Sequence, residues 1–379
     1  MRIESKIPDV GTSIFTVMSK MALDHNAINL SQGFPDFMID EEIIRLVHRY
    51  MKEGHNQYAP MPGTPVLRNV IAEVIRSSFG RAVDPDSEIT ITSGATESIF
   101  SVISAFVSRG DEVIMFDPSY DSYDPSVRLN GGVPVHVNMT ASFGIDWNEV
   151  RSRISRATRM IIINTPHNPS GAILSESDLR ELEQIAEEHD LLVLSDEVYE
   201  RLIFDNAVHQ SVLRFPTLAN RSFAVFSFGK TFHATGWKMG YVVAPAALTT
   251  EIRRAHQFVV FSVNTPIQLA MADYLRDPAH YTGLGRFYQQ KRDFFLNEIN
   301  GSSFEPIPSH GSYFQLVSYR AISQEPDVAM AERLTKEFKV ASIPISVFYK
   351  DNTDRRILRF CFAKKEETLA QACRILRGI

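Results

Sequence analysis

Lys230 is the residue whose type and position in this chain could support covalent chemistry. It follows an apolar segment of strand composition, residues 223–228, and a second cation, Lys238, lies eight residues further along. A lysine at the end of a strand can be kept partly dry, lose its proton and act as an amine nucleophile. Most single lysines are instead solvated surface residues. The residues around Lys230 therefore decide between the two interpretations.

A nucleotide-binding loop is the alternative for this stretch, because Gly229, Lys230 and Thr231 resemble the end of such a loop. That loop requires a glycine five residues before Gly229, so that backbone amides can wrap the phosphate, and this chain has Ala224 there. A Gly-x-Gly-x-x-Gly sequence does not follow any of the expected strands either. Neither kind of nucleotide site is expected.

The composition is that of a folded protein that binds small molecules. The 379 residues are 44% hydrophobic and 22% charged, which allows a large core, and the length favours two domains. A formal net charge of -6 argues against nucleic acid or an anionic membrane as a main partner. Residues 1–15 lack the apolar core of a signal peptide, and no run approaches the ~20 apolar residues that cross a bilayer. A cytoplasmic location is therefore expected.

No metal site is expected. The two cysteines, Cys361 and Cys373, are too few for a disulfide framework or a metal cluster and should be buried small side chains. The histidines His167, His233 and His310 are widely scattered, so each is expected in a structural position or at the rim of a site.

Seven short apolar segments, most of them separated by stretches long enough for a helix, predict a seven-stranded sheet that is mainly parallel. The last two segments lie about a dozen residues apart, which leaves room for an antiparallel pair. The fold class expected is therefore a three-layer α/β/α domain with helices on both faces of the sheet. The segments are residues 89–92, 113–116, 133–137, 160–163, 191–194, 223–228 and 241–244.

The remaining patterns divide the chain into three parts. Residues 1–40 are expected to form an N-terminal arm that contributes to a small domain, residues 41–282 the large domain, and residues 283–379 a C-terminal α+β domain. Helical patterns predict helices at 40–52, at 65–79, from Ser175 onward and over 251–277, with two more at 286–299 and 366–377. Strands are expected at 312–317 and 357–362.

Polar residues follow the expected strands at their carboxyl ends, which is where ligands bind in a parallel sheet. After the first strand, Gly94, Ala95 and Thr96 open a helix whose free amides suit a phosphate. Each of these residues also has an ordinary structural interpretation. The other strand ends supply a flat ring, two donors to an oxygen, a carboxylate, and a hydroxyl beside the amine: Tyr120, Asn168, Tyr199, Asp196, Ser227 and Lys230. Together these groups predict bound pyridoxal 5'-phosphate, held covalently by a lysine.

The chain also resembles a known family, the class I/II aminotransferases among the fold-type I pyridoxal-phosphate enzymes. Within that family it is most similar to the branch of methionine aminotransferases and kynurenine aminotransferases (glutamine transaminase K), through residues 33–36, 235–238 and 358–362. The resemblance covers almost the whole chain. It is carried by Gly33-Phe34-Pro35-Asp36, Asn168-Pro169-Ser170-Gly171, Asp196-Glu197-Val198-Tyr199, Ser227-Phe228-Gly229-Lys230-Thr231 and Arg359-Phe360-Cys361-Phe362.

The resemblance implies a role for each residue that would hold the cofactor. Lys230 would form the imine, and Asp196 would pair with the pyridine nitrogen. Tyr120 would stack on the ring, while Asn168 and Tyr199 would bond its phenolic oxygen. The phosphate would be held by Gly94, Ala95, Thr96, Ser227 and Lys238.

The resemblance also implies how substrate is bound and how the subunits assemble. Arg359 would grip the substrate carboxylate through a bidentate contact, helped by the backbone of Gly33 and by Asn168. Tyr58 would reach the phosphate in a neighbouring subunit, which makes the active form a homodimer. The wall of the side-chain pocket would be formed by Phe15, Tyr58, Tyr120 and Tyr313.

The expected activity is transfer of the amino group of methionine, an aromatic amino acid or glutamine to a 2-oxo acid, with Lys230 moving the proton. Two alternatives remain. A cysteine-conjugate or cystathionine β-lyase would share nearly every residue named. A non-catalytic regulator that binds pyridoxal phosphate would need a DNA-binding module, for which neither terminus leaves room.

Overall fold

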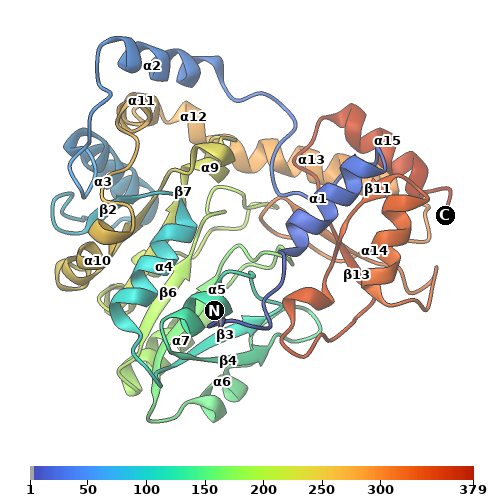
Figure 1. Ribbon diagram of the computed structural model, residues 1–379, viewed down its shortest axis with the longest axis horizontal. Helices are drawn as coiled ribbons and strands as arrows, with labels where there is room; N and C mark the ends of the chain where they lie inside the picture. The colour runs from blue at the N-terminus through green and yellow to red at the C-terminus, as the bar shows by residue number, and fades with distance from the viewer. Residues whose placement is uncertain (1–3) are drawn as a thin grey trace.

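Seven strands form the central sheet of the protein, whose computed structural model describes residues 4–379 (Figure 1). The strands are β2 (Ile89–Thr92), β3 (Glu112–Asp117), β4 (Val133–Asn138), β5 (Thr158–Asn164), β6 (Leu192–Asp196), β7 (Ser222–Ser227) and β8 (Gly240–Val243). Their order across the sheet is β2-β8-β7-β6-β5-β3-β4. The pairs formed among β3 to β7 are parallel, whereas β8 runs antiparallel to both of its neighbours.

All seven apolar segments of the sequence are strands of this sheet. The predicted fold class, a mainly parallel sheet in a three-layer α/β/α arrangement, is confirmed. The antiparallel pair left open for the last two segments is β7 with β8.

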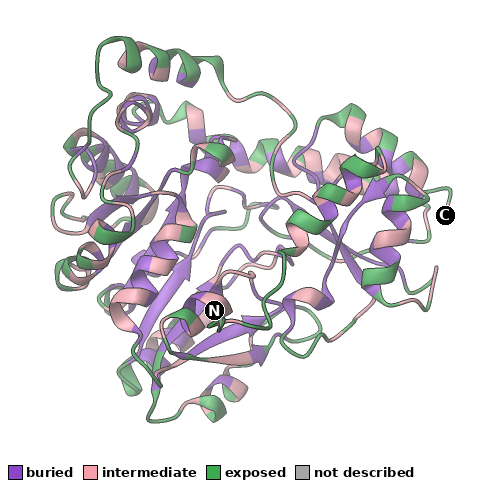
Figure 2. Ribbon diagram, viewed as in Figure 1, coloured by how far each residue is buried: buried purple, intermediate pink, exposed green. Residues whose placement is uncertain are grey.

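Helices cover both faces of the sheet. Because successive side chains of a strand point to opposite faces, Met160 and Ile162 of β5 pack into one core cluster and Ile161 and Ile163 into the other. The central strands are buried, the edge strand β4 is exposed at both ends, and the outer faces of the helices are exposed (Figure 2). The first cluster is covered by α4 (Ala95–Phe106), α5 (Tyr123–Leu129) and α10 (Ala246–Val259); the second by α3 (Pro65–Phe79), α6 (Trp147–Arg153), α7 (Glu176–Glu188) and α11 (Thr265–Leu275).

Helix α7 shows how local sequence sets these elements. The Ser175 side chain accepts from the amide of Asp178, and the Asp178 side chain accepts from the amide of Ser175, which forms a capping box. One stripe of the helix is buried against the sheet, as its apolar spacing predicts. The stripe consists of Leu179, Leu182, Ile185 and Ala186.

A second, antiparallel sheet lies in the C-terminal part of the chain, in the order β12-β13-β10-β9. The N-terminal segment joins this part, because β1 (Ile28–Asn29) pairs with β11 (Val340–Ala341) and α1 (Ile14–Asp24) packs beside α14 (Figure 1). The proposed domain boundaries after residues 40 and 282 stay predictions. The sheet consists of β9 (Glu305–Pro306), β10 (Phe314–Ser318), β12 (Ile343–Pro344) and β13 (Ile357–Cys361), and its helices are α13 (Leu284–Ile299), α14 (Asp327–Lys336) and α15 (Glu366–Leu376).

The prediction of one continuous helix over 251–277 is wrong. Helix α10 ends at Val259, and α11 begins at Thr265 because the Asn264 side chain caps it and Pro266 occupies its first turn. None of the helices among residues 4–379 combines the length and the apolar character that spanning a bilayer demands. The other helices are α2 (Glu41–Lys52), α8 (Pro216–Ala219), α9 (Phe228–Thr231) and α12 (Ala279–Thr282).

Gly171 joins the central sheet to the C-terminal part. It follows the loop that carries Asn168, and its carbonyl accepts from the amides of His310 and Gly311 at 2.9 and 3.0 Å. Its φ is +73°, and an added Cβ would lie 2.0 Å from the hydroxyl of Ser309. Both the backbone conformation and the close approach therefore require glycine.

Replacing Gly171 with alanine tests this junction. We expect Gly171→Ala to lower the free energy of unfolding by about 2–4 kcal/mol, because the backbone strain at this φ and the steric clash with Ser309 both destabilise the fold. Gly80→Ala is the matched control, because Gly80 has the same φ of +73° with nothing within 4 Å of the added Cβ, and about 1 kcal/mol is expected. Urea unfolding of both variants measures the difference. Equal losses would show that the contact with Ser309 contributes nothing.

Candidate active site

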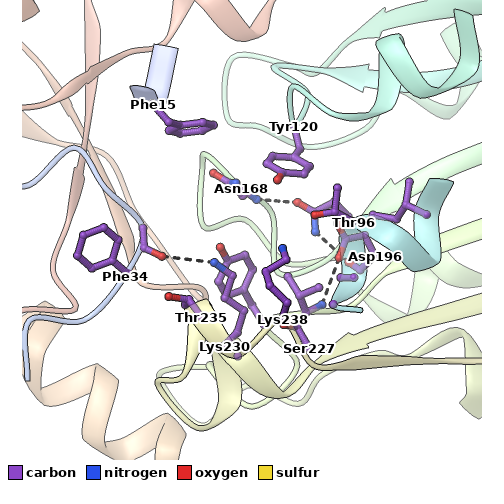
Figure 3. Close-up of a pocket in the computed structure, with 18 of the residues that line it drawn as sticks. Phe15, Phe34, Thr96, Tyr120, Asn168, Asp196, Ser227, Lys230, Thr235 and Lys238 are labelled. Atoms are coloured by element: carbon purple, nitrogen blue, oxygen red, sulfur yellow. Dashed lines mark hydrogen bonds between the residues drawn. The ribbon is translucent and has the colours of Figure 1, made fainter. Parts of the chain in front are cut away.

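One cavity of about 300 Å³ lies at the carboxyl ends of the central strands. Figure 3 shows residues from three parts of the chain around it: the N-terminal segment with Phe15 and Phe34, the central sheet, and the loop with Asn168. Every site residue predicted from the sequence lines this cavity except Tyr58 and Tyr313. They are Phe15, Gly33, Gly94, Ala95, Thr96, Tyr120, Asn168, Asp196, Tyr199, Ser227, Lys230, Lys238 and Arg359.

Lys230 reaches this cavity from α9, the single helical turn that follows β7. Its Nζ donates to the hydroxyl of Tyr313 at 2.9 Å and to the carbonyl of Gly33 at 3.3 Å. Burial lowers the pKa of Lys230 to about 8. At pH 7 this leaves roughly a tenth of the side chain as the free amine, against less than about a thousandth for an ordinary lysine.

Asp196 is the last residue of β6 and is only 4% exposed. Its carboxylate accepts from neutral donors, the hydroxyl of Tyr123 at 2.6 Å and the amide of Val198 at 3.3 Å. Burial raises the pKa of Asp196 to about 6, and the Tyr123 hydrogen bond opposes that shift. A cationic group brought by a ligand would stabilise this carboxylate strongly.

The N-terminus of α4 forms an anion-binding corner of the cavity. Gly94 precedes the helix with φ +75°, and a Cβ added there would lie 3.4 Å from Cε and Nζ of Lys238. The ammonium of Lys238 therefore lies against the first turn, whose amides have no intrahelical partners. Ser227, at the end of β7, contributes a hydroxyl group to the same cavity. Amides, a cation and a hydroxyl together fit a phosphate group.

Arg359 of β13 enters the cavity from the C-terminal sheet and is fully buried. Its guanidinium donates to neutral acceptors, the side-chain oxygen of Asn168 and the carbonyl of Ser31, both at 2.8 Å. Its Nε has no hydrogen-bond partner in the described structure, and burial lowers the pKa of Arg359 to about 10. The ring of Phe314 lies 3.9 Å from the guanidinium carbon. A buried arginine with a spare donor fits a carboxylate from a ligand.

The four tyrosines that the sequence predicts for the site differ in whether they line the cavity. Tyr58 is 81% exposed, outside the cavity, and its ring packs edge-on against Phe261 at 5.2 Å. Tyr120 and Tyr199 line the cavity, and burial raises the pKa of Tyr120 to about 12. Tyr313 was expected to form part of the side-chain pocket, but its hydroxyl faces Lys230 instead.

Several residues of the cavity were not found from the sequence. Asn164 ties two loops together, because its side chain donates to the carbonyl of Asp196 at 2.9 Å and accepts from the amide of Asn168 at 2.8 Å. Asn164 ends strand β5, and this position could have identified it as a site residue from the sequence. Tyr123 does not line the cavity, but its hydroxyl donates to Asp196; it lies three residues after Tyr120, a spacing that could have identified it. The other lining residues that were not predicted are Gln32, Phe34, Ile99, Val198, Gly229, Thr235, Met239 and Phe314.

The donor set of this cavity fits pyridoxal 5'-phosphate. A phosphate matches the corner beside Lys238, a protonated ring nitrogen matches the desolvated carboxylate of Asp196, and an aldehyde matches the partly neutral amine of Lys230. The spare donor on Arg359 is left for the carboxylate of an amino acid.

Comparison with known proteins defines the family. Residues 25–376 match the model of aminotransferase class I and II. The chain is 49% identical to methionine aminotransferase of Escherichia coli, over 99% of this chain and 98% of that protein. It is 34% identical to a probable N-succinyldiaminopimelate aminotransferase of Mycobacterium tuberculosis, over 98% of this chain and 97% of that one. It is 32% identical to a kynurenine–oxoglutarate transaminase of Dictyostelium discoideum, over 96% and 93% of the two chains.

Solved structures agree with this result. A structure from Escherichia coli, described as having a methionine aminotransferase function, superposes with a TM-score of 0.98 at 48% identity and covers 100% of both chains. The chain therefore belongs to the class I and II aminotransferase family. It is an aminotransferase that depends on pyridoxal 5'-phosphate, and the family, cofactor and enzyme class predicted from the sequence are confirmed.

Proposed function

We propose that this enzyme transfers the amino group of methionine, an aromatic amino acid or glutamine to a 2-oxo acid, using the cavity around Lys230. The observation that carries the proposal is the meeting of three groups in one cavity: the amine of Lys230, the carboxylate of Asp196 and the guanidinium of Arg359. The similarity to a methionine aminotransferase and a kynurenine–oxoglutarate transaminase supports the same substrates.

Lys230 and Asp196 have the central catalytic roles. When bound, the cofactor supplies an aldehyde that takes up the amino group and a ring that accepts the electrons of the broken Cα–H bond. The Nζ of Lys230 would take the proton from the substrate Cα and deliver it to the cofactor carbon that takes up the amino group, which its lowered pKa permits near neutral pH. The carboxylate of Asp196 would keep the ring nitrogen protonated. Tyr199 would support the ring by donating to its phenolic oxygen.

The remaining lining residues position the cofactor and the substrate. Asn168 would donate to the phenolic oxygen while its side-chain oxygen stays with Arg359, and Tyr120 would stack on the ring. Arg359 would bind the substrate carboxylate, with the backbone of Gly33 beside it. The phosphate would be held by five residues that line the cavity, Gly94, Ala95, Thr96, Ser227 and Lys238.

The side-chain pocket favours uncharged substrates. Phe15, Phe34, Tyr120 and Phe314 contribute rings to the cavity, and Arg359 is the one arginine among the described residues that line it. Aromatic walls suit thioether and aromatic side chains. A second carboxylate on the substrate would find no second guanidinium there.

A panel of amino acids tests the substrate class. We expect methionine, phenylalanine and glutamine to convert the lysine-bound cofactor to its amino form, a conversion measured by absorbance. Aspartate should do so far more slowly.

Replacing Arg359 tests the carboxylate contact. Arg359→Lys should raise KM at least ~30-fold, about 2 kcal/mol, because a bidentate contact is lost. Arg253→Lys, whose arginine bonds Ile89 and Thr90 outside the cavity, is the control and should leave KM unchanged.

A preference for aspartate would contradict the pocket assignment. Release of thiol, pyruvate and ammonia, without stoichiometric transfer of the amino group to a second 2-oxo acid, would instead favour the β-lyase alternative, which the comparisons do not support.

We also infer that the enzyme works as a homodimer, and we retain the cytoplasmic location as a prediction. Tyr58, the predicted phosphate contact that lies outside the cavity, packs against Phe261, which is 54% exposed, and Phe258, three residues earlier in the chain, is 88% exposed. Exposed apolar patches mark interfaces. A second copy covering these aromatic residues would let Tyr58 reach the phosphate of its neighbour.

Sedimentation tests the dimer. The protein should sediment at twice its chain mass of 42.8 kDa, and Phe261→Asp should shift it toward the single chain, because a buried charge without a partner opposes association. Val133→Asp is the control and should stay dimeric, because Val133 is exposed on β4, the edge strand farthest from β2 in the central sheet. A single chain at all concentrations would refute the dimer.

A further inference from the structure

The hydroxyl of Tyr313 contacts Lys230 from behind the residues that line the cavity, and none of the roles above explains that contact. The residue is fully buried just before β10, and its hydroxyl contacts Lys230 and Gly33, with the side chain of Tyr199 as a third polar neighbour. It donates to the carbonyl of Gly33 and accepts from Nζ of Lys230 at 2.9 Å. The Gly33 carbonyl also accepts from Nζ, at 3.3 Å. The amine of Lys230, the hydroxyl of Tyr313 and the carbonyl of Gly33 therefore form a closed triangle of hydrogen bonds.

The directions of these hydrogen bonds determine where the amine can react. A tyrosine hydroxyl has one proton, and Tyr313 gives it to Gly33, so the side facing Lys230 can only accept. A neutral lysine amine has two N–H bonds and one lone pair. With both N–H bonds directed at these two oxygens, the lone pair takes the direction that remains, which opens onto the cavity lined by Lys230.

We infer that Tyr313 is a positioning residue for the transfer reaction, which holds the free amine of Lys230 with its lone pair toward the substrate Cα. This inference rests on the role proposed above for Lys230. A lysine side chain loses about 2 kcal/mol of rotamer freedom when it is fixed, and a fixed acceptor beside the amine would supply that restraint once the substrate has displaced Lys230 from the cofactor.

The packing around Tyr313 keeps its hydroxyl in place. Its ring packs against Tyr199, Tyr288 and Phe314, with ring centroids 5.1, 5.8 and 4.9 Å away. Gly33 can approach because it has no side chain, since an added Cβ would lie 2.8 Å from the Phe314 ring and 3.4 Å from the Tyr313 ring. The triangle thus joins the N-terminal segment, the central sheet and the C-terminal sheet.

The same ring cluster contains a matched control. Tyr288 is also fully buried and touches Tyr313, but its hydroxyl has no hydrogen-bond partner in the described structure. Tyr313→Phe and Tyr288→Phe therefore remove the same atom from neighbouring buried rings, and only the first removes a contact to Lys230. Both variants leave in place the other titratable and charged groups that face Lys230, namely Asp196, Tyr199, Lys238, Arg359 and Cys361.

Two measurements on the full-length protein test the inference. The first is the rate at which the cofactor-free chain takes up pyridoxal 5'-phosphate covalently, followed by absorbance across pH, which reports the fraction of Lys230 present as amine. The second is the steady-state kcat and KM of the loaded enzyme with methionine. For Tyr313→Phe we expect the uptake midpoint to move to lower pH by about half a unit or more, because an acceptor that favours the ammonium is lost. We expect kcat to fall roughly tenfold with KM little changed.

Tyr288→Phe should reproduce the wild-type midpoint and kcat. The inference is overturned if Tyr313→Phe matches the wild type in both measurements, or if Tyr288→Phe causes the same changes, which would assign them to ring packing. A wild-type chain that does not bind the cofactor covalently would refute the role of Lys230 itself, and is thereby distinguished from failure of this inference alone. Thermal unfolding of both variants verifies that each one folds.

Discussion

Loss of water around the charged groups of one cavity is the constraint on which the structure depends. Burial lowers the pKa of Lys230 to about 8, raises that of Asp196 to about 6 and lowers that of Arg359 to about 10. Each group is thus pushed toward its neutral form, which opposes folding in the absence of ligand. A cofactor with a cationic ring nitrogen and a substrate with a carboxylate stabilise the charged forms of the two groups they meet. The chemistry and the binding energy therefore have the same physical origin.

The sheet positions these groups by register. Asp196 ends β6, and Lys230 follows the adjacent parallel strand β7, so both side chains reach the same edge. Arg359 comes from a different sheet, and the carbonyl of Ser31 that holds it belongs to the segment just after β1. The end of the cavity that suits the cofactor is thus built by the central sheet, and the end that suits the substrate by the two chain ends folded together. Tyr313 and its triangle lie where the two ends meet.

The sequence predicts the central sheet and most of the cavity because both have local signals, namely apolar segments followed by polar or small residues. The break between α10 and α11 also had local signals, Asn264 and Pro266, but the apolar spacing on either side obscured them. The hydrogen bond from Tyr123 to Asp196 and the orientation of Tyr313 could not be predicted in this way. Both depend on side-chain directions across elements far apart in the chain, and an aromatic residue beside a strand is equally consistent with a pocket wall.

The most direct test is to fix the lysine–cofactor link by borohydride reduction of the purified holoenzyme and to map the modified peptide by mass spectrometry. The desolvated amine at the end of β7 predicts a single phosphopyridoxyl group, on Lys230, because its lowered pKa favours the free amine, whereas Lys238 lies beside Gly94 in the corner that fits the phosphate. A label on Lys238 or on any other lysine, or a holoenzyme without a covalent link, would contradict the assignment of Lys230 as the reacting amine.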